Sequence, residues 1–530
     1  MTEQVSYSPG STDHPLLTDT IGQSLDRAVA VFPDREAVVD VPSGRRWTYA
    51  ELGRDVDLLA QDLRARGVGK GDRVGIWAPN CPEWVLVQYA TARLGAILVN
   101  INPAYRVHEL AYVLNQSGIS LLVSATSHRE SDYRAMVAEI RGQCPGLRET
   151  LWIGDPGWQL LDSEGEFPDL ECHEPINIQY TSGTTGFPKG ATLSHHNILN
   201  NGHCVGQLLG YTEQDRICLP VPFYHCFGMV LGNLAAVSHA ACVIIPSPGF
   251  DPAATLRAVA AERATSLYGV PTMFIAELGL PDFADHDVSS LRTGLMGGSP
   301  CPVEVMKRVM TDLRMPEVAI AYGMTETSPV STLTRRDDDL EHRTATVGLV
   351  LPHVEVRVAD PVSGGTVPRG TPGELCTRGY SVMLGYWEQP ERTAEAVDRD
   401  GWMHTGDLAV MREDGYLTVV GRIKDMIIRG GENIYPREIE EFLHGHPAIV
   451  DVQVVGVPDD RYGEEVCAFV ILRDPAGTLS VDELTEFCRG RLAHFKTPRH
   501  LRVVTAFPMT VSGKVRKAEL RELAVQARER

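Results

Sequence analysis

Residues 180–190 (YTSGTTGFPKG) bring hydroxyls, glycines and a lysine together in one short segment. Glycines free backbone N–H groups to converge on an anion, and Lys189 adds a mobile positive charge. The segment is not a Walker A loop, because Pro188 precedes the lysine where that motif needs glycine. We therefore expect it to hold the outer phosphates of ATP, the alternative being a polar surface loop. The candidate residues are Thr181, Ser182, Gly183, Thr184, Thr185, Gly186 and Lys189.

A second candidate element is the short segment YGMTE at residues 322–326. Glu326 is a hard oxygen ligand of the kind that a magnesium ion bridging ATP phosphates requires, although it could also be an ordinary helix-capping carboxylate. Tyr322 offers a flat face on which adenine could stack, or it could be a core aromatic residue.

Two further side chains have types suited to a nucleotide. Asp407, in HTGDL, is an acceptor-only carboxylate that could bind both hydroxyls of a ribose, with a turn-capping role as the alternative. Arg422 follows the strand-like GYLTVVG and could reach the ribose or the α-phosphate with its fixed fork of donors. A surface salt bridge is the alternative for Arg422.

Lys514 lies in a glycine-containing turn, TVSGK, near the end of the chain. Its ammonium is a flexible positive charge that could enter a site, although a single lysine on a basic surface would mean little. Residues 491–530 contain ten Lys+Arg against three Glu, a local charge of +7 in a chain of net charge -20. This region could attract ATP and other anions, or it could simply be a solvated helix face.

These residues need a scaffold, and the chain predicts one from alternating segments. Residues 55–66 have helical apolar spacing, a turn follows, and residues 73–77 (RVGIW) indicate a buried strand. The same order recurs at 251–270, which is typical of a parallel sheet. We expect an α/β fold with a large N-terminal region of parallel-type sheets and helices plus a small β-rich module, over residues 1–423. A small, mobile α+β domain, with helices near 436–444 and 481–493, then spans 424–530.

Composition excludes several classes of protein. With 530 residues, 43% of them hydrophobic, the chain is long enough for large folded cores, and it is not disordered or fibrous. A net charge of -20 argues against a general nucleic-acid binder. Residues 228–246 are about long enough to span a membrane, but polar side chains interrupt them, so we expect a buried helix and strand. The N-terminus does not resemble a signal or transit peptide.

The eleven cysteines are far apart and form no C-x-x-C pair. This pattern predicts reduced thiols, a cytoplasmic protein and no zinc site. We interpret His195 and His196 as the start of the helix that follows the hydroxyl-rich loop.

The motifs in combination resemble those of the adenylate-forming superfamily, which contains acyl-CoA synthetases, adenylation domains and luciferases. The resemblance runs from about residue 20 to about residue 520. It rests on the loop, YGMTE, and the segments 386–407, 421–425 (GRIKD) and 508–514 (PMTVSGK). Within that superfamily the chain is most similar to medium-chain fatty acyl-CoA synthetases, in the stretches 373–387, 423–436 and 494–501.

The resemblance implies a reaction in two steps: a carboxylate and ATP give an acyl-adenylate and pyrophosphate, and the thiol of CoA then displaces AMP. It implies catalytic roles for Lys514, Thr185 and Glu326, the last as the magnesium ligand. It also places the nucleotide against Gly298, Ser299, Tyr322, Gly323, Met324, Thr325, Asp407 and Arg422.

The resemblance further implies a hinge at Lys424, about which the C-terminal domain rotates between the two steps. The rotation would bring Gly430, Gly431 and Glu432 to the thiol channel, the alternative being a plain β-turn. The acyl pocket would be lined by His225, Phe227, Gly228, Val270, Met296, Gly297 and Gly298. Residues 223–228 contain no acidic side chain to pair with an α-ammonium, which disfavours an amino-acid substrate.

We therefore expect an ATP-dependent, AMP-forming acyl-CoA synthetase for a medium-chain fatty acid, with ATP, Mg²⁺ and CoA as cofactor and co-substrates. The alternatives are an aryl-CoA ligase, an adenylation enzyme that loads an external carrier protein, a luciferase-like oxygenase and a non-catalytic nucleotide-binding homologue. Nucleic acid and a membrane span are not expected. Chain length, the choice of alkyl or aryl acid, and the oligomeric state stay open, a homodimer included.

Overall fold

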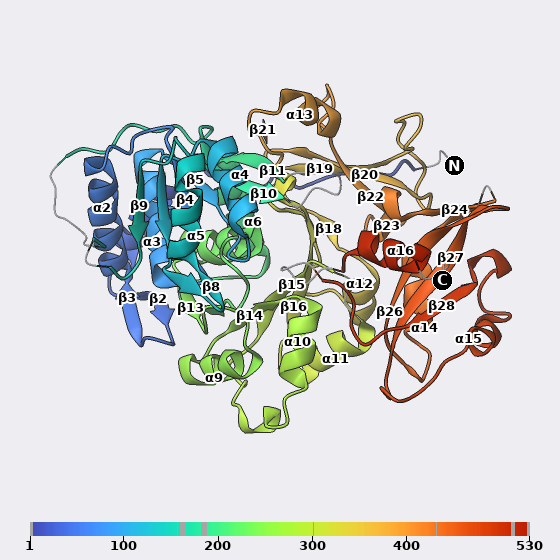
Figure 1. Ribbon diagram of the computed structural model, residues 1–530. Coiled ribbons are helices and arrows are strands. Elements are labelled where there is room, and N and C mark those ends of the chain that lie inside the picture. The colour runs from blue at the N-terminus through green and yellow to red at the C-terminus, as the bar shows by residue number, and fades with distance from the viewer. Residues whose placement is uncertain are drawn as a thin grey trace. The chain divides into compact units, whose positions relative to one another are not determined.

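The computed structural model describes residues 4–155, 157–158, 165–181, 188–299, 302–430, 432–509 and 515–526 (Figure 1). Contacts within the chain group it into two units. The larger unit comprises 8–356 and 377–404, and the smaller comprises 1–7, 357–376 and 405–530.

A nine-stranded sheet is the first layer of the larger unit. Its six central strands run parallel, with antiparallel strands at both edges. Its order is β18 (Leu349–Val350), β17 (Val330–Leu333), β16 (Glu317–Gly323), β15 (Thr293–Gly297), β14 (Ser266–Gly269), β12 (Arg216–Cys218), β13 (Cys242–Ile245), β2 (Glu36–Asp40) and β3 (Arg45–Thr48).

A seven-stranded sheet is the second layer. Five of its strands are parallel, and an antiparallel hairpin with one further strand completes it. Its order is β21 (Gly385–Tyr386), β11 (Lys189–Ser194), β10 (Pro175–Thr181), β5 (Ile97–Asn100), β4 (Arg73–Trp77), β6 (Leu121–Ser124) and β9 (Glu149–Trp152).

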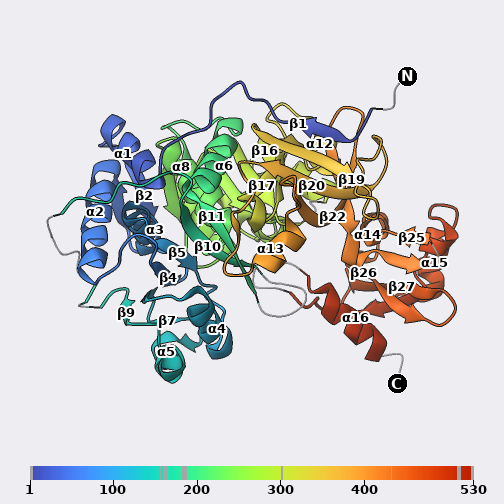
Figure 2. The ribbon, with the colours of Figure 1, turned by 90° about the horizontal axis from the view of Figure 1, so that it is seen from above.

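Helices cover these sheets. Figure 2 shows α1 (Ile21–Val31), α2 (Tyr49–Ala65) and α3 (Pro82–Leu94) packed side by side. α3 is buried on nearly every side, including its polar residues Glu83, Gln88 and Thr91, which explains why it lacks an amphipathic stripe. α9 (Pro252–Glu262) lies beside β12, α10 (Pro271–Leu278) beside β14, and α11 (Val303–Thr311) beside β16 (Figure 1).

The segment 228–246 is a buried helix followed by a buried strand, as predicted. The short helix α7 (Cys226–Gly228) continues into a π-helical turn, η2 (Met229–Leu234), and then α8 (Ala235–Ser238), before β13 begins. None of the helices in the described part of the chain is long and apolar enough to cross a membrane.

Two further five-stranded sheets are present: the strands of the first include residues of both units, and the second lies within the smaller unit. The first has the order β1 (Tyr7–Pro9), β19 (Val354–Ala359), β20 (Gly373–Gly379), β22 (Met403–Met411) and β23 (Leu417–Arg422). The second joins β25 (Glu432–Ile434), β24 (Ile427–Arg429), β27 (Gly463–Leu472) and β26 (Ile449–Asp459), with β28 (His500–Val503) on β27. The helices of the smaller unit are α14 (Pro436–Leu443), α15 (Val481–Cys488) and α16 (Lys517–Gln526). The predicted α/β fold class is thus confirmed, whereas the mobile domain starting at residue 424 stays a prediction.

Candidate active site

Three neighbouring parallel strands of the nine-stranded sheet end at one edge, and predicted site residues lie at the end of each strand or directly after it. β14 pairs with β15 through Gly269 and Met296, and β15 pairs with β16 through Gly297 and Ala321. Val270, Gly298 with Ser299, and Tyr322 with Gly323 therefore meet at the carboxyl edge, where ligands of open α/β sheets bind. The fold brings the predicted adenine-binding and acyl-binding residues of this sheet together.

Gly298 has both a conformational and a spatial reason to be glycine. Its φ of +88° lies in the left-handed region, which strains any other residue. A Cβ atom there would lie 3.3 Å from Cγ1 of Val270, so the missing side chain leaves room beside that residue. A Cβ atom on Gly297 would meet the carbonyl oxygen of Ala321 at 3.1 Å. Neither Gly297 nor Gly298 therefore places a side chain at the end of β15.

The hydroxyl-rich loop is held at the tip of the hairpin formed by β10 and β11. Thr181 and Lys189 are the last residue pair of this hairpin, and the Thr181 hydroxyl donates to the Lys189 carbonyl oxygen at 3.5 Å. The predicted residues between them, as well as Gly431 and Lys514, lie outside the described residues, so their roles stay predictions. The predicted loop residues that lie outside the described residues are Ser182, Gly183, Thr184, Thr185 and Gly186.

Tyr386 links the predicted phosphate-binding lysine to the predicted magnesium ligand. Its hydroxyl donates to Oε1 of Glu326 at 2.8 Å, and the Lys189 ammonium lies 4.8 Å from the centre of its ring. Glu326 is 5% exposed and sits in the short turn η4 (Thr325–Thr327) after β16. Burial, and then the negative charge of Glu326, raises the pKa of Tyr386 well above its usual range, so its hydroxyl stays a donor.

Sequence reasoning gave Tyr386 no role, although it lies in one of the motif segments. β21 pairs with β11 so that Tyr386 faces Ala191, and this register carries its ring to Lys189. The local sequence does not indicate the contact between Tyr386 and Lys189, because this contact depends on the pairing of segments that are far apart in the chain.

The three predicted acyl segments also converge. Phe227 stacks on Tyr268 with ring centroids 5.6 Å apart and an interplanar angle of 27°. Nδ1 of His225 accepts a hydrogen bond from the Phe227 backbone N–H at 3.1 Å, which puts the proton of the neutral imidazole on Nε2. Met296 is fully buried, and Gly228 is buried as well. An aromatic and apolar surface thus borders the carboxyl edge.

In the smaller unit, Asp407 and Arg422 form an ion pair. They face each other across β22 and β23, with Arg422 Nε 3.0 Å from Asp407 Oδ1. Asp407 is buried and Arg422 is exposed. The structure therefore shows the salt bridge that was the alternative for Arg422, and it also places both predicted ribose-binding side chains next to each other.

The predicted hinge residue is tied to the last helix. Lys424 lies in a single turn, η5 (Ile423–Asp425), and its carbonyl oxygen accepts a hydrogen bond from Arg521 of α16 at 3.1 Å. Arg521 also pairs with Asp425 at 3.2 Å. A rotation about Lys424 would therefore either break the contacts with Arg521 or move α16 together with Lys424.

Gly430 occupies the turn between β24 and β25, with Glu432 exposed beside it. Its φ of +59° is left-handed, and its N–H donates to the Tyr462 carbonyl oxygen at 2.8 Å. Below the turn, Arg429 forms a buried two-point ion pair with Glu465, at 2.5 and 2.9 Å. The turn predicted to meet the thiol is therefore held on a rigid base.

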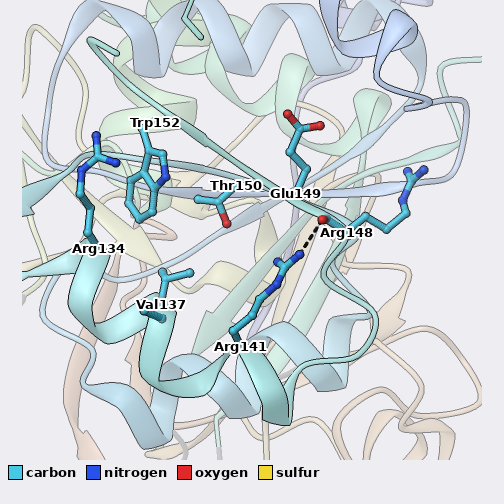
Figure 3. A pocket seen from close by; sticks show the side chains of 8 residues that line it. Arg134, Val137, Arg141, Arg148, Glu149, Thr150 and Trp152 are labelled. Atoms are coloured by element: carbon cyan, nitrogen blue, oxygen red, sulfur yellow. Dashed lines mark hydrogen bonds between the residues drawn. The ribbon is translucent and has the colours of Figure 1, made fainter. Parts of the chain in front are cut away.

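A separate hollow of about 370 Å³ lies beside β9 and the helix α5 (Tyr133–Ile140) (Figure 3). Its arginines already bind protein atoms: Arg141 donates to the Arg148 carbonyl oxygen at 2.6 Å, and Arg134 pairs with Asp155 and lies over Trp152. They do not converge on one point, so we assign no ligand to this hollow.

Comparisons with known proteins agree on one family. The model of the AMP-binding enzyme family matches residues 25–387, and that of the AMP-binding enzyme C-terminal domain matches 438–514. YngI of Bacillus subtilis is 47% identical over 96% of this chain and 98% of its own. The mitochondrial medium-chain acyl-CoA ligase ACSF2 of Danio rerio is 45% identical, over 98% and 90%. The solved structure of the anthranilate CoA ligase AuaEII with anthranoyl-AMP superposes with a TM-score of 0.88 at 26% identity, over 98% and 99%.

Proposed function

The chain belongs to the AMP-binding enzyme family, and on that premise we propose that it joins a medium-chain fatty acid to CoA. It is an AMP-forming acid–thiol ligase. In the first step, a carboxylate oxygen of the acid attacks the α-phosphorus of ATP and pyrophosphate leaves. In the second, the CoA thiol gives up its proton, its sulfur attacks the acyl carbon, and AMP leaves.

The observation that carries the proposal is the contact of Lys189 and Glu326 with the same side chain, Tyr386. The lysine supplies positive charge for the outer phosphates of ATP. The carboxylate accepts the hydrogen bond of the tyrosine hydroxyl, and there it would hold a cation against the same phosphates. Both charges are positioned before substrate binds, which is what electrostatic stabilisation of a charged transition state requires.

The residues fit a magnesium ion. Glu326 offers hard carboxylate oxygen, is buried, and has the Thr325 hydroxyl next to it in the chain. A bound Mg²⁺ would neutralise negative charge on the phosphate oxygens. The Tyr386 hydroxyl orients one oxygen of Glu326, as outer hydrogen-bond partners do for metal ligands.

For the nucleotide, we propose that Tyr322 and Gly323 receive the adenine at the end of β16, while Gly298 and Ser299 flank it from β15. In the smaller unit, the Asp407–Arg422 pair would bind the ribose, with the carboxylate accepting from its hydroxyls. Lys514 would neutralise charge during adenylation, and rotation about Lys424 would then exchange it for the turn at Gly430.

The acyl group would lie along the aromatic and apolar surface formed by Phe227, Tyr268 and Val270. We infer a medium-chain acid because the relative ACSF2 is a medium-chain acyl-CoA ligase. An aryl acid is the second candidate, since the stacked Phe227–Tyr268 pair could receive an aromatic ring and the structural neighbour AuaEII is an anthranilate CoA ligase.

A substrate screen tests the proposal. Pyrophosphate release and thioester formation are measured with alkyl acids of increasing length and with aryl acids, each with and without CoA. We expect a maximum of kcat/KM at medium-chain alkyl acids and a thioester whenever CoA is present. A maximum at an aryl acid would replace the substrate assignment, and pyrophosphate without any thioester would favour loading of an external carrier protein.

We further propose that the enzyme works in the cytoplasm. The cysteines that the structure describes are all free thiols, as expected of a reducing compartment. By its printed name, the relative ACSF2 is mitochondrial.

A further inference from the structure

Cys172, His173 and His196 lie together on the larger unit. Each offers one metal-binding atom, and these atoms all lie within 4.8 Å of one another. The two imidazole rings have centroids 4.5 Å apart, and the His196 backbone N–H donates to the Cys172 carbonyl oxygen at 2.7 Å. The chain has no C-x-x-C pair, so the sequence predicted no zinc site; here the fold adds a distant histidine to an adjacent Cys–His pair.

The three residues sit at the base of the hairpin whose tip carries the hydroxyl-rich loop. Cys172 and His173 precede β10, and His196 lies in the first turn of α6 (His195–Leu208), which follows β11 (Figure 2). The first residue pair of the hairpin, Pro175 with Ser194, lies between them. A link between these residues would close the open end of the hairpin.

The surroundings orient His196. One ring nitrogen of His196 is hydrogen-bonded to the backbone of Leu17, and the other ring nitrogen is the one that a metal ion would bind. Such outer partners are usual for metal-binding histidines.

The neighbouring His195 is not part of the cluster. It is fully buried, and its Nδ1 accepts a hydrogen bond from the Ile21 backbone N–H at 3.1 Å. The interpretation of the pair as the start of a helix is confirmed by α6, whose first turn points His195 into the core and leaves His196 beside Cys172.

We propose that Cys172, His173 and His196 bind one zinc-class divalent ion that braces the base of the β10–β11 hairpin. Thiolate and imidazole ligands select zinc over magnesium. Three protein ligands with water as the fourth is a common arrangement for zinc. Zinc bonds of about 2.0 Å to nitrogen and 2.3 Å to sulfur separate tetrahedral ligand atoms by roughly 3.4 Å. Because the three ligand atoms lie within 4.8 Å of one another, the cluster must close by at most about 1.4 Å.

The exposed position of His173 gives the ion a route from solvent. Because the ion would bind the folded chain and not the unfolded one, it should raise the melting temperature in proportion to the logarithm of its concentration above Kd. This effect does not depend on catalysis.

Cobalt(II) is the probe, because a Co–thiolate bond gives a near-ultraviolet charge-transfer band. Chelator-treated full-length protein is titrated with Co²⁺, and then with Zn²⁺ in competition. We expect one equivalent of Co²⁺, a thiolate band, displacement by Zn²⁺ and no displacement by excess Mg²⁺. Zn²⁺ should also raise the melting temperature.

Variants locate the site. Cys172→Ser should abolish the band, and His173→Gln and His196→Gln should each weaken Co²⁺ binding by at least about tenfold. Cys81→Ser, at the other partly exposed cysteine among those that the structure describes, and His108→Gln, on α4 (Val107–Ser117), serve as controls and should leave the titration unchanged. A wild-type protein without a thiolate band, or a band that persists in Cys172→Ser, would overturn the proposal.

Discussion

Replacing Tyr386 with phenylalanine tests how Glu326 is held. The change removes only the hydroxyl that donates to Glu326 at 2.8 Å, and it keeps the ring below Lys189. The side chains of Tyr386 and Glu326 are both buried, with exposed fractions of 8% and 5%. A hydrogen bond to a charged group contributes about 1.5–3 kcal/mol, and a loss of about 2 kcal/mol lowers a rate roughly thirtyfold.

We expect Tyr386→Phe to lower kcat/KM for adenylation by roughly this factor and to raise the Mg²⁺ concentration that gives half-maximal activity. Conversion of supplied acyl-AMP and CoA to thioester should change much less, because the outer phosphates are gone by then. Acid-dependent pyrophosphate release across a magnesium titration measures the first effect. Tyr49→Phe is the control, since its buried hydroxyl also makes a 2.8 Å hydrogen bond, to the Ala241 carbonyl oxygen.

Adenylation by Tyr386→Phe with an unchanged rate and magnesium dependence would refute the reasoning. An equal loss in Tyr386→Phe and Tyr49→Phe would show that the loss comes from general destabilisation.

Three further predictions concern other parts of the chain. Because the φ of Gly298 is left-handed, Gly298→Ala should lower the free energy of unfolding by about 1–2 kcal/mol, as measured by urea unfolding. Gly298→Leu should in addition lower kcat/KM for the longest acid that is a good substrate about a hundredfold relative to the alanine variant. An equal loss of kcat/KM for all acids would reject the assignment of Gly298 to the acyl pocket. Lys424→Pro should slow thioester formation from acyl-AMP and CoA but leave adenylation unchanged, whereas Lys514→Ala should slow adenylation but leave thioester formation unchanged. The rates of the two half-reactions are measured separately, and the same pattern of losses in both variants would contradict the hinge at Lys424. Burial holds the pKa of Glu277 in the folded chain well above its usual range. In the unfolded chain the pKa of a glutamate is about 4.3, so above that pH the unfolded chain loses a proton that the folded chain keeps. The free energy of unfolding therefore falls as the pH rises. Glu277→Gln should therefore stabilise the protein more at about pH 8 than at about pH 5 in urea unfolding, and a pH-independent difference would contradict this.

Local patterns predicted the elements well where one segment determines its own structure. The strand predicted at residues 73–77 is β4, and the helix predicted at 55–66 belongs to α2, which starts earlier because Thr48 and Glu51 form a capping box. The helix predicted at 481–493 was too long: α15 ends at Cys488, since Arg489 has ψ of 125° and Gly490 a left-handed φ of +71°. The glycine was the available signal for that end.

Contacts set by pairing between distant segments could not be predicted. Each of Lys189, Glu326, Asp407 and Arg422 was named from its own motif, but the sequence did not show that Tyr386 would lie between the first two or that the last two would pair. Strand register decides both arrangements, and no single motif contains it. The Cys172 cluster escaped notice for the same reason.

The central claim is that the enzyme activates its acid by adenylation before CoA takes part. The most direct test is the exchange of labelled pyrophosphate into ATP without CoA, followed by analysis of the nucleotide formed once CoA is added. The account predicts exchange that depends on a medium-chain acid, and then one AMP for each thioester. Exchange that is absent without CoA, or formation of ADP and phosphate in place of AMP and pyrophosphate, would contradict it.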